Sequence, residues 1–194
     1  MYKVAFCGKA GTGKNTAANV LVEMIPFLKT YAMLAFADPI KQIVKTMFPH
    51  VNDEHLYGPS ELRNTIIKGA KDEEGNPLTI RQALLDIGTK VGRGYNDSIW
   101  LDNMGFRIDE AAKDNKPIVM ITDCRFRNEF DWLKEQNFNM IKIKRDSKIQ
   151  INHVSETAQD SLLDEEFDFI IDNNGSYPDL RRIMCRQIIP NLKK

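Results

Sequence analysis

The pattern of apolar and polar positions along this chain predicts alternating strands and helices. Short apolar runs, typical of buried strands, occupy residues 2–7, 31–37, 117–122, 140–144 and 167–171. Apolar residues at helical spacing predict helices over 14–24, 40–48, 80–90, 98–113, 129–135 and 178–192. Strands that alternate with helices favour an α/β fold, in which a parallel five-stranded sheet is covered by helices on both faces.

Residues 49–78 differ from the rest, because they are polar and rich in glycine and proline around an acidic DEEGNP stretch. We interpret them as a partly helical, mobile excursion over the sheet edge without a core of its own. Thr79 then has the position of a helix N-cap, with Gln82 as its capping-box partner. The whole chain, 1–194, is accordingly predicted to be one domain.

Composition narrows the class of protein further. Lys plus Arg and Asp plus Glu number 27 each, and this balance argues against a general nucleic-acid coat, which needs excess positive charge. The cysteines Cys7, Cys124 and Cys185 are far apart and form no CxxC pair, so we expect reduced thiols and no zinc site. No run approaches the roughly 18 apolar residues of a membrane span, and no signal peptide is evident, so a cytoplasmic location is expected.

Residues 8–16, GKAGTGKNT, are the strongest chemical signal in the sequence. Gly8, Gly13 and Lys14 match G-x-x-x-x-G-K between a predicted strand and a predicted helix. Such glycines let successive N–H groups face one anion at a helix N-terminus, while the lysine reaches the β- and γ-phosphates. The segment therefore predicts an ATP phosphate site made by Gly8, Ala10, Gly11, Thr12, Gly13, Lys14, Asn15 and Thr16.

The residue after the lysine departs from the common pattern. Asn15 stands where Ser or Thr usually ligates Mg²⁺, and Thr16 follows one place later. This form resembles the loop of nucleoside monophosphate kinases and disfavours GTPases and motor ATPases. We expect Thr16 to bond a phosphate oxygen, and Mg²⁺ to be held mainly by phosphate and water with Asn15 nearby.

A second candidate cluster follows the predicted strand 117–122. Asp123 lies at the carboxyl end of that strand, where open α/β sheets bind ligands. Its carboxylate is a candidate to orient a metal-bound water or to anchor an arginine, and helix capping is the alternative. Arg125 is the favoured group for an acceptor phosphate, because a guanidinium is a fixed donor fork, whereas Arg127 is equally a candidate surface residue.

The string DCRFRNE resembles the DxRFxNE signature of phage deoxynucleoside monophosphate kinases and their relatives. Other segments agree in order along nearly the whole chain: GKAGTGKNT, FADPIK at 36–41, TIRQALLDIGTKVGR at 79–93, HVSE at 153–156 and IIDNNGSYPDL. The departures are Arg127, where proline is frequent, and Asn15, where aspartate is frequent.

The resemblance implies a P-loop NTPase fold of the nucleoside monophosphate kinase type, with three α/β/α layers. It implies transfer of the γ-phosphate from ATP, with Mg²⁺, to a deoxynucleoside monophosphate, giving the diphosphate and ADP for DNA synthesis. An acceptor-binding excursion at about 38–100 and a lid at about 145–166 are further expectations. We also expect the protein to act on small-molecule substrates and to bind neither a nucleic-acid polymer nor a membrane. A homodimer is a further expectation.

The resemblance also assigns residues to the acceptor. Trp100 is a candidate to stack on a base, and core packing is its alternative. Asn128 and Glu129 are expected to bond either the loop or the nucleoside. Arg81 and Arg93 are candidates to pair with phosphate, and exposed helix charges are their alternative. The full acceptor set is Asp38, Lys41, Arg81, Arg93, Trp100, Arg125, Asn128 and Glu129.

Arg145 opens the implied lid and is expected to bridge the donor and acceptor phosphates, which completes a catalytic set of Lys14, Asp123, Arg125 and Arg145. The metal candidates are Asn15, Thr16 and Asp123. Asn173 and Gly175 resemble an adenine-contacting turn, and an ordinary asparagine-glycine turn is the alternative. His153, Ser155 and Glu156 lack an orienting third group and an oxyanion loop, so we do not interpret them as a nucleophilic site.

Two other functions stay open from the sequence. A dephospho-coenzyme A kinase has the same phosphate loop and a similar closing segment. A P-loop ATPase or nucleotide switch is the alternative from another class. The arginine-rich DCR segment favours an acceptor that carries a phosphate, and it does not identify the base.

Overall fold

A computed structural model describes residues 1–25, 30–146 and 158–194 of the chain. The chain divides into two compact units. The first unit comprises Met1–Ala35 and Asn103–Lys194, and the second comprises Phe36–Asp102. The described helices include none that is both long enough and apolar enough to cross a membrane.

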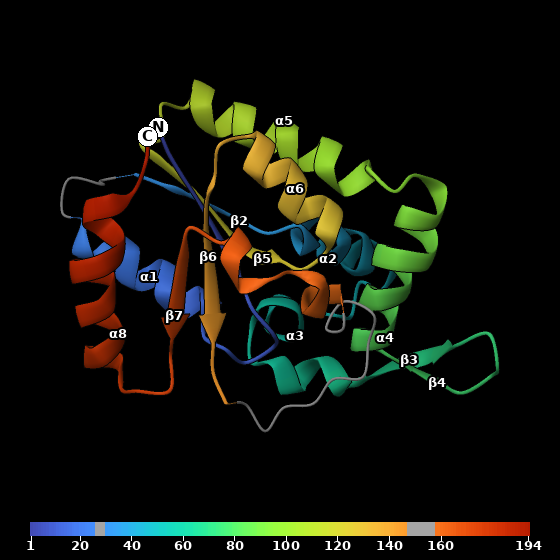
Figure 1. Cartoon of the computed structure of the whole chain (residues 1–194). Helices are drawn as coiled ribbons and strands as arrows, with labels where there is room; N and C mark the ends of the chain where they lie inside the picture. Colours follow the sequence, from blue (N-terminus) through green and yellow to red (C-terminus); the bar gives the residue numbers. More distant parts are fainter. Residues whose placement is uncertain (26–29, 147–157) are drawn as a thin grey trace. The chain divides into compact units, whose positions relative to one another are not determined.

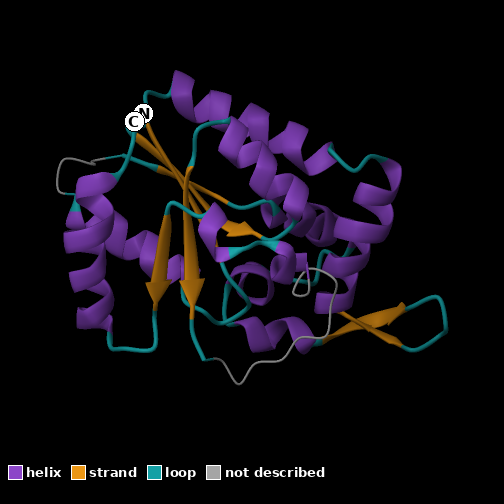
Figure 2. Cartoon of the chain, in the orientation of Figure 1, coloured by secondary structure: helices purple, strands orange, loops and turns teal. Residues whose placement is uncertain are grey.

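The first unit is built on a five-stranded parallel sheet of order β2-β5-β1-β6-β7, which confirms the predicted sheet. Its central strands are buried on both faces, as in sheets with helices on each side (Figure 2). The strands are β1 Tyr2–Cys7, β2 Ala32–Leu34, β5 Ile118–Cys124, β6 Asn139–Lys144 and β7 Phe169–Asp172.

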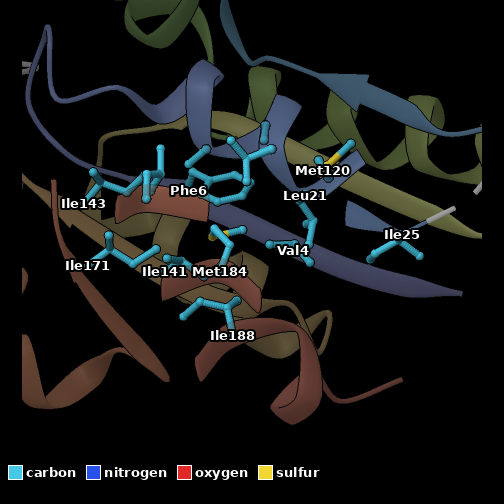
Figure 3. Packing of buried hydrophobic residues seen from close by; sticks show 14 of the residues in the cluster. Val4, Phe6, Leu21, Ile25, Met120, Ile141, Ile143, Ile171, Met184 and Ile188 are labelled. Atoms are coloured by element: carbon cyan, nitrogen blue, oxygen red, sulfur yellow. The ribbon is translucent and has the colours of Figure 1, made fainter. Parts of the chain in front are cut away.

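Helices cover both faces of this sheet, so the three-layer prediction is confirmed (Figure 1). On one face, α1 and α8 pack their apolar sides against alternate strand residues such as Val4, Phe6 and Met120 (Figure 3). The other face is covered by α6 and the part of α5 in the first unit (Figure 1). These helices are α1 Lys14–Met24, α5 Ile99–Lys113, α6 Arg127–Glu135 and α8 Tyr177–Ile183, and α8 continues as a π-helical segment, Met184–Ile188, and a 3₁₀ turn, Ile189–Asn191.

The second unit has a buried apolar cluster of its own, to which Val51, Leu56 and Ile67 contribute. The other buried members of the cluster are Val44, Ile80, Ala83 and Ile87, so residues 49–78 share a core with the segments that flank them, and the single-domain organisation remains a prediction. The predicted partial helicity is present, but the antiparallel hairpin β3–β4 was not foreseen. The elements are α2 Ala37–Met47, α3 Asp53–Tyr57, a 3₁₀ turn Ser60–Asn64, β3 Ile66–Lys71, β4 Pro77–Thr79, α4 Ile80–Leu85 and a π-helical segment Asp86–Arg93.

The first residues of helices α4 and α2 can be related to the residue types found there. Thr79 is the N-cap of α4 and accepts the N–H of Gln82 at 3.2 Å, as predicted. The Gln82 amide is not the expected capping-box partner, because it donates to Asp86 at 2.9 Å. Helix α2 begins before the predicted residue 40, since Pro39 is compatible with the first helical turn.

Two short 3₁₀ turns follow the described end of β6, at Ala158–Ser161 and Asp164–Glu166. Asp164 ties the second turn to β6 through ion pairs with Lys142, at 2.9 Å, and with Lys144. Hydrogen bonds from Lys144 and Lys142 lower the pKa of Asp164 below its usual value. The folded state therefore favours the ionised carboxylate.

This lowered pKa predicts a pH-dependent effect for Asp164→Asn. The stabilisation by Asp164 is fully present above the pKa of an unfolded aspartate and is lost as the pH falls through the lower folded-state pKa. Asp164→Asn should lower the melting temperature at pH 7 by a few degrees at most, and the difference from wild type should shrink below about pH 4.

Thermal unfolding followed by circular dichroism between pH 3 and 7 tests this. Glu165→Gln is the matched control, because it removes the same charge from the next residue, which forms no ion pair with the described residues. An unchanged difference between wild type and Asp164→Asn at pH 3 and pH 7 contradicts the prediction.

Candidate active site

The glycine loop follows β1, and the DCRFRNE segment begins with the last two residues of the neighbouring strand β5. Cys7, the last residue of β1, pairs with Cys124, the last residue of β5, after a one-residue register shift between Ala5 and Cys7. Gly8 directly follows Cys7, and Asp123 and Arg125 flank Cys124. The parallel register thus brings the phosphate loop and the arginine-bearing segment to the same carboxyl edge, where α/β sheets bind ligands.

Two glycines of the loop are required by both backbone angle and space. Gly8 has φ +150°, and a Cβ there would lie 2.5 Å from the Ile143 carbonyl oxygen. Gly13 has φ +95°, and its Cβ would lie 2.4 Å from Nδ2 of Asn173. Since side chains at such φ values are strained and these two also clash, the loop conformation depends on glycine at both positions.

Lys14 begins α1 and its side chain folds back along the loop. The side chain is buried, and Nζ donates to the carbonyl of Gly8 at 2.6 Å and to that of Lys9 at 2.9 Å. The ammonium group is therefore held within the loop, at the start of a helix whose N-terminus favours anions.

Two buried side-chain amides also bond loop carbonyls. Nε2 of Gln159 donates to Gly8 O at 3.1 Å, and Nδ2 of Asn173 donates to Thr12 O at 2.8 Å. The sequence reasoning missed Gln159, because a glutamine in a polar stretch between strands carries no signal of its own. Asn173 was predicted to contact adenine; its amide lies against the loop, and the adenine contact remains a prediction.

The metal candidates lie around the same loop. Asn15 and Thr16 are exposed in the first turn of α1, and Asp123 is half-buried near the end of β5. Thr12, by contrast, is buried, with its hydroxyl bonded to Lys9 O at 2.9 Å. Among the described residues, no group of three or more His, Cys, Asp or Glu side chains is placed to hold a metal ion.

The thiols of Cys7 and Cys124 lie buried below this edge. Burial raises the pKa of the Cys124 thiol well above its usual value, and the hydrogen bond with Cys7 and the charges of Glu129 and Asp123 raise it further. Cys124 is therefore a protonated thiol at neutral pH, and it serves packing, since a nucleophilic cysteine requires the thiolate.

Glu129 supports the backbone of the DCRFRNE segment. Its buried carboxylate accepts the N–H of Arg125 at 2.8 Å and that of Phe126 at 3.1 Å, at the start of α6. The side-chain oxygen of Asn128 accepts the N–H of Glu129 at 2.9 Å. These residues were expected to bond either the loop or the nucleoside. The hydrogen bonds described here are to the loop, and a contact with the nucleoside remains a prediction.

The two arginines of the segment have different surroundings. Arg125 is half-buried beside Cys124 at the sheet edge. Arg127 is exposed and ion-paired with Asp131 at 2.9 Å and Glu166 at 2.7 Å. Hydrogen bonds to these two carboxylates raise the pKa of Arg127. Arg127 thus has the environment of a surface residue, which was one of the two interpretations given for it.

Four charged acceptor candidates belong to the second unit and have partners within it. Lys41 lies 3.5 Å from the Asp38 carboxylate and 4.3 Å from the ring centroid of Tyr57. Arg81 donates to Ser60 O at 2.7 Å and to the Asn64 side chain at 2.9 Å. Arg93 is near Asp97, at 3.3 Å. Their roles in acceptor binding remain predictions.

Trp100 is buried in the second unit. Its indole N–H donates to Gly88 O at 2.8 Å, and a Cβ on Gly92 would lie 2.3 Å from the ring. The ring thus occupies the space that Gly92 leaves open, and this is the packing that the core interpretation predicts. Stacking of Trp100 on a base remains a prediction.

The remaining candidates lie at two chain segments near the sheet edge. Arg145 is exposed and directly follows β6, and Gly175 lies in the turn between β7 and α8. The neighbouring Asn174 accepts the N–H of Asp146 at 2.8 Å, so the two segments touch. Residues 147–157 of the predicted lid, with His153, Ser155 and Glu156, lie outside the described residues.

Comparisons with known proteins place these observations in a family. Residues 57–183, more than half of the chain, match the family model for deoxynucleotide monophosphate kinase. A protein of Acanthamoeba polyphaga mimivirus, named "Putative deoxynucleotide monophosphate kinase", is 32% identical over 184 residues, which cover 90% of this chain and 89% of that protein.

Solved structures share the fold at low identity. Shikimate kinase from Acinetobacter baumannii, in complex with shikimate, matches with a TM-score of 0.50 and 15% identity over 100% of this chain and 96% of that one. Dephospho-CoA kinase from Campylobacter jejuni matches with a TM-score of 0.47 and 16% identity over 98% of this chain and 97% of that one. By the family model and the viral relative, the chain belongs to the deoxynucleotide monophosphate kinase family, whose members are phosphotransferases.

Proposed function

We propose that this protein transfers the γ-phosphate of ATP to a deoxynucleoside monophosphate, giving a diphosphate and ADP and so supplying nucleotides for DNA synthesis. The observation that carries the proposal is the pairing of Cys7 with Cys124 at the carboxyl ends of β1 and β5. It sets a phosphate-binding loop beside an arginine-bearing segment on adjacent strands. Membership of the family supports the same reaction.

The glycine loop binds the phosphates of the donor in this proposal. Its N–H groups and the N-terminus of α1 face the anion, and Lys14 exchanges loop carbonyls for the β- and γ-phosphate oxygens. The turn at Asn173 and Gly175 is proposed to lie near the adenine. Each of these groups neutralises or orients charge on the donor.

The residues near the loop fit a bound Mg²⁺, since this ion prefers oxygen ligands and shares them with substrate phosphates and water. Thr16, Asn15 and Asp123 supply a hydroxyl, an amide and a carboxylate. These groups would hold the ion directly or through water. When bound, it would neutralise negative charge on the transferred phosphoryl group.

Arg125 is the proposed anchor of the acceptor phosphate, since its guanidinium offers paired donors. Glu129 fixes the backbone of Arg125 by accepting its N–H. Residues of the second unit are proposed to complete acceptor binding: Asp38, Lys41, Arg81, Arg93 and Trp100. Arg145 is proposed to bridge the two phosphates during transfer.

The chemical step needs little acid or base chemistry. An acceptor phosphate oxygen attacks the γ-phosphorus, the new P–O bond forms, and the bond from the γ-phosphorus to the β–γ bridging oxygen breaks. The attacking oxygen is already anionic, so no general base is required, and ADP leaves with the electron pair of the broken bond. Positioning and charge neutralisation by Lys14, Arg125 and Arg145 then account for catalysis.

Acceptor-dependent ADP formation tests the proposal. We expect ADP to form from MgATP only when a deoxynucleoside monophosphate is added, with an equal amount of the matching diphosphate. Each deoxynucleoside and ribonucleoside monophosphate, and dephospho-coenzyme A, should be added singly in a coupled ADP assay. ADP formation without an acceptor indicates an ATPase, and a response to dephospho-coenzyme A alone contradicts nucleotide phosphorylation.

Lys14→Met is the control that assigns the activity to this site. The methionine fills similar space without charge, so the melting temperature should change little while kcat/KM falls by at least about a hundredfold, as for loss of a preorganised charge contact. A variant with full turnover would place the observed activity elsewhere.

Gly13→Ala should abolish ATP binding, because its methyl group would lie 2.4 Å from the Asn173 amide in a backbone conformation that disfavours side chains. Gly75→Ala is the matched control. Gly75 has φ +86° but no atom within 4 Å of an added Cβ, so this change costs only roughly 1 kcal/mol of stability. Calorimetric titration with ATP measures both variants, and equal affinities would contradict the role of the loop.

Arg125→Met should raise the KM for the monophosphate by roughly tenfold or more, since one charged hydrogen-bonding group is lost from the acceptor phosphate. The KM for ATP should change much less. Arg127→Met, two residues on, removes an exposed arginine that is paired with Asp131 and Glu166, and both KM values should stay within about twofold. Steady-state kinetics with each substrate varied in turn decide the matter. An acceptor KM raised equally by both substitutions rules out a specific contact by Arg125.

A further inference from the structure

We infer that Gln159 and Asn173 are positioning residues, which hold the glycine loop in its phosphate-binding conformation from behind. Both side chains are more than nine-tenths buried, and each amide donates to a loop carbonyl. Neither amide needs to touch the nucleotide in this role. The inference rests on the proposed ATP site and adds the residues that preorganise it.

Peptide geometry links these carbonyls to the anion. In a trans peptide unit, the carbonyl of one residue and the N–H of the next point in opposite directions within one plane. Asn173 fixes Thr12 O, and it thereby orients the N–H of Gly13. Gln159 fixes Gly8 O, and it thereby orients the N–H of Lys9. A loop that turns N–H groups toward phosphate must turn such carbonyls into the protein, where they need donors.

The Gln159 amide also affects how easily Lys14 can leave the loop carbonyls. Gly8 O accepts from both Lys14 Nζ, at 2.6 Å, and Gln159 Nε2, at 3.1 Å. When Lys14 turns toward the phosphates, the Gln159 amide still satisfies this buried carbonyl. Without it, the ammonium group would leave an unsatisfied acceptor behind, so the lysine would be released at greater cost. Gln159 therefore favours ATP binding through Lys14 as well as through the loop.

Both amides are themselves held in place. Gln159 lies in the 3₁₀ turn Ala158–Ser161, whose Asp160 forms an ion pair with Lys9 of the loop at 2.8 Å. Asn173 directly follows β7, and its N–H donates to Lys144 O at 2.8 Å. Its amide occupies the space that Gly13 leaves by lacking a Cβ. Such anchored partners keep a binding loop preorganised.

The test compares three buried amides. Gln159→Met and Asn173→Leu remove the donors at the loop with little change in volume. Asn139→Leu is the matched control, because that amide is also buried and donates to backbone carbonyls, of Lys3 and Lys193, both at 2.9 Å. Asn139 begins β6, at the end of the strand opposite to the loop.

Calorimetric titration with ATP in the absence of acceptor, and thermal unfolding, are measured for the full-length wild type and each variant. We expect all three variants to unfold at lower temperature, while Gln159→Met and Asn173→Leu alone weaken ATP binding, each by roughly tenfold. In steady-state turnover, the KM for ATP should rise more than kcat falls, and the KM for the monophosphate should stay unchanged.

ATP affinity within twofold of wild type in both loop variants overturns the inference. Equal weakening by Asn139→Leu also overturns it, since the effect would then be general loss of stability. So does a wild type that binds no ATP. Because affinity is measured without acceptor, a protein that binds ATP but phosphorylates no monophosphate refutes the proposed function and leaves this test intact.

Discussion

The active-site edge of this protein depends on how the peptide units between β1 and α1 are oriented. A loop that presents N–H groups to an anion leaves carbonyl groups directed into the protein, and buried carbonyls must be hydrogen-bonded. Lys14, Gln159 and Asn173 supply these donors from three separate parts of the chain. In the proposed ATP site, phosphate binding therefore also depends on the positions of β6, β7 and the turn at Ala158–Ser161, although these elements lie far from the glycine loop in sequence.

The pairing of β1 with β5 determines which segments lie beside the glycine loop. The pairing of Cys7 with Cys124 at the ends of β1 and β5 brings two motifs more than a hundred residues apart to one edge of the sheet. Both cysteines are buried, so two small apolar side chains fill the space below the proposed site. Burial also raises the pKa of Cys124, which keeps this thiol uncharged. The apolar residues of these strands serve packing, while the proposed chemistry lies with Asp123 near the end of β5 and with residues beyond the strand ends.

The sequence predicted most of the first unit because its signals are local. Strand β1, the glycine loop and helix α1 were predicted at the residues where they occur, since an apolar run, glycines and Pro26 mark the boundaries. The hairpin β3–β4 was missed, because its strands are mostly exposed and lack the usual alternation. Gln159 was missed for a different reason: only tertiary structure reveals that this polar side chain is buried and which carbonyl it bonds.

The DCRFRNE segment shows why a matched motif does not assign the same role to each of its residues. Glu129 is one of its two acids, and its buried carboxylate accepts two consecutive backbone N–H groups. These hydrogen bonds hold the backbone of Arg125 in place, so Glu129 determines the position from which the Arg125 side chain extends. A residue of this kind affects the site through geometry, and replacing Glu129 would misplace its neighbour Arg125, while a direct contact of Glu129 with the acceptor remains a prediction. Buried acceptors within a motif are therefore better assigned to its scaffold, and half-buried donors beside them to its chemistry.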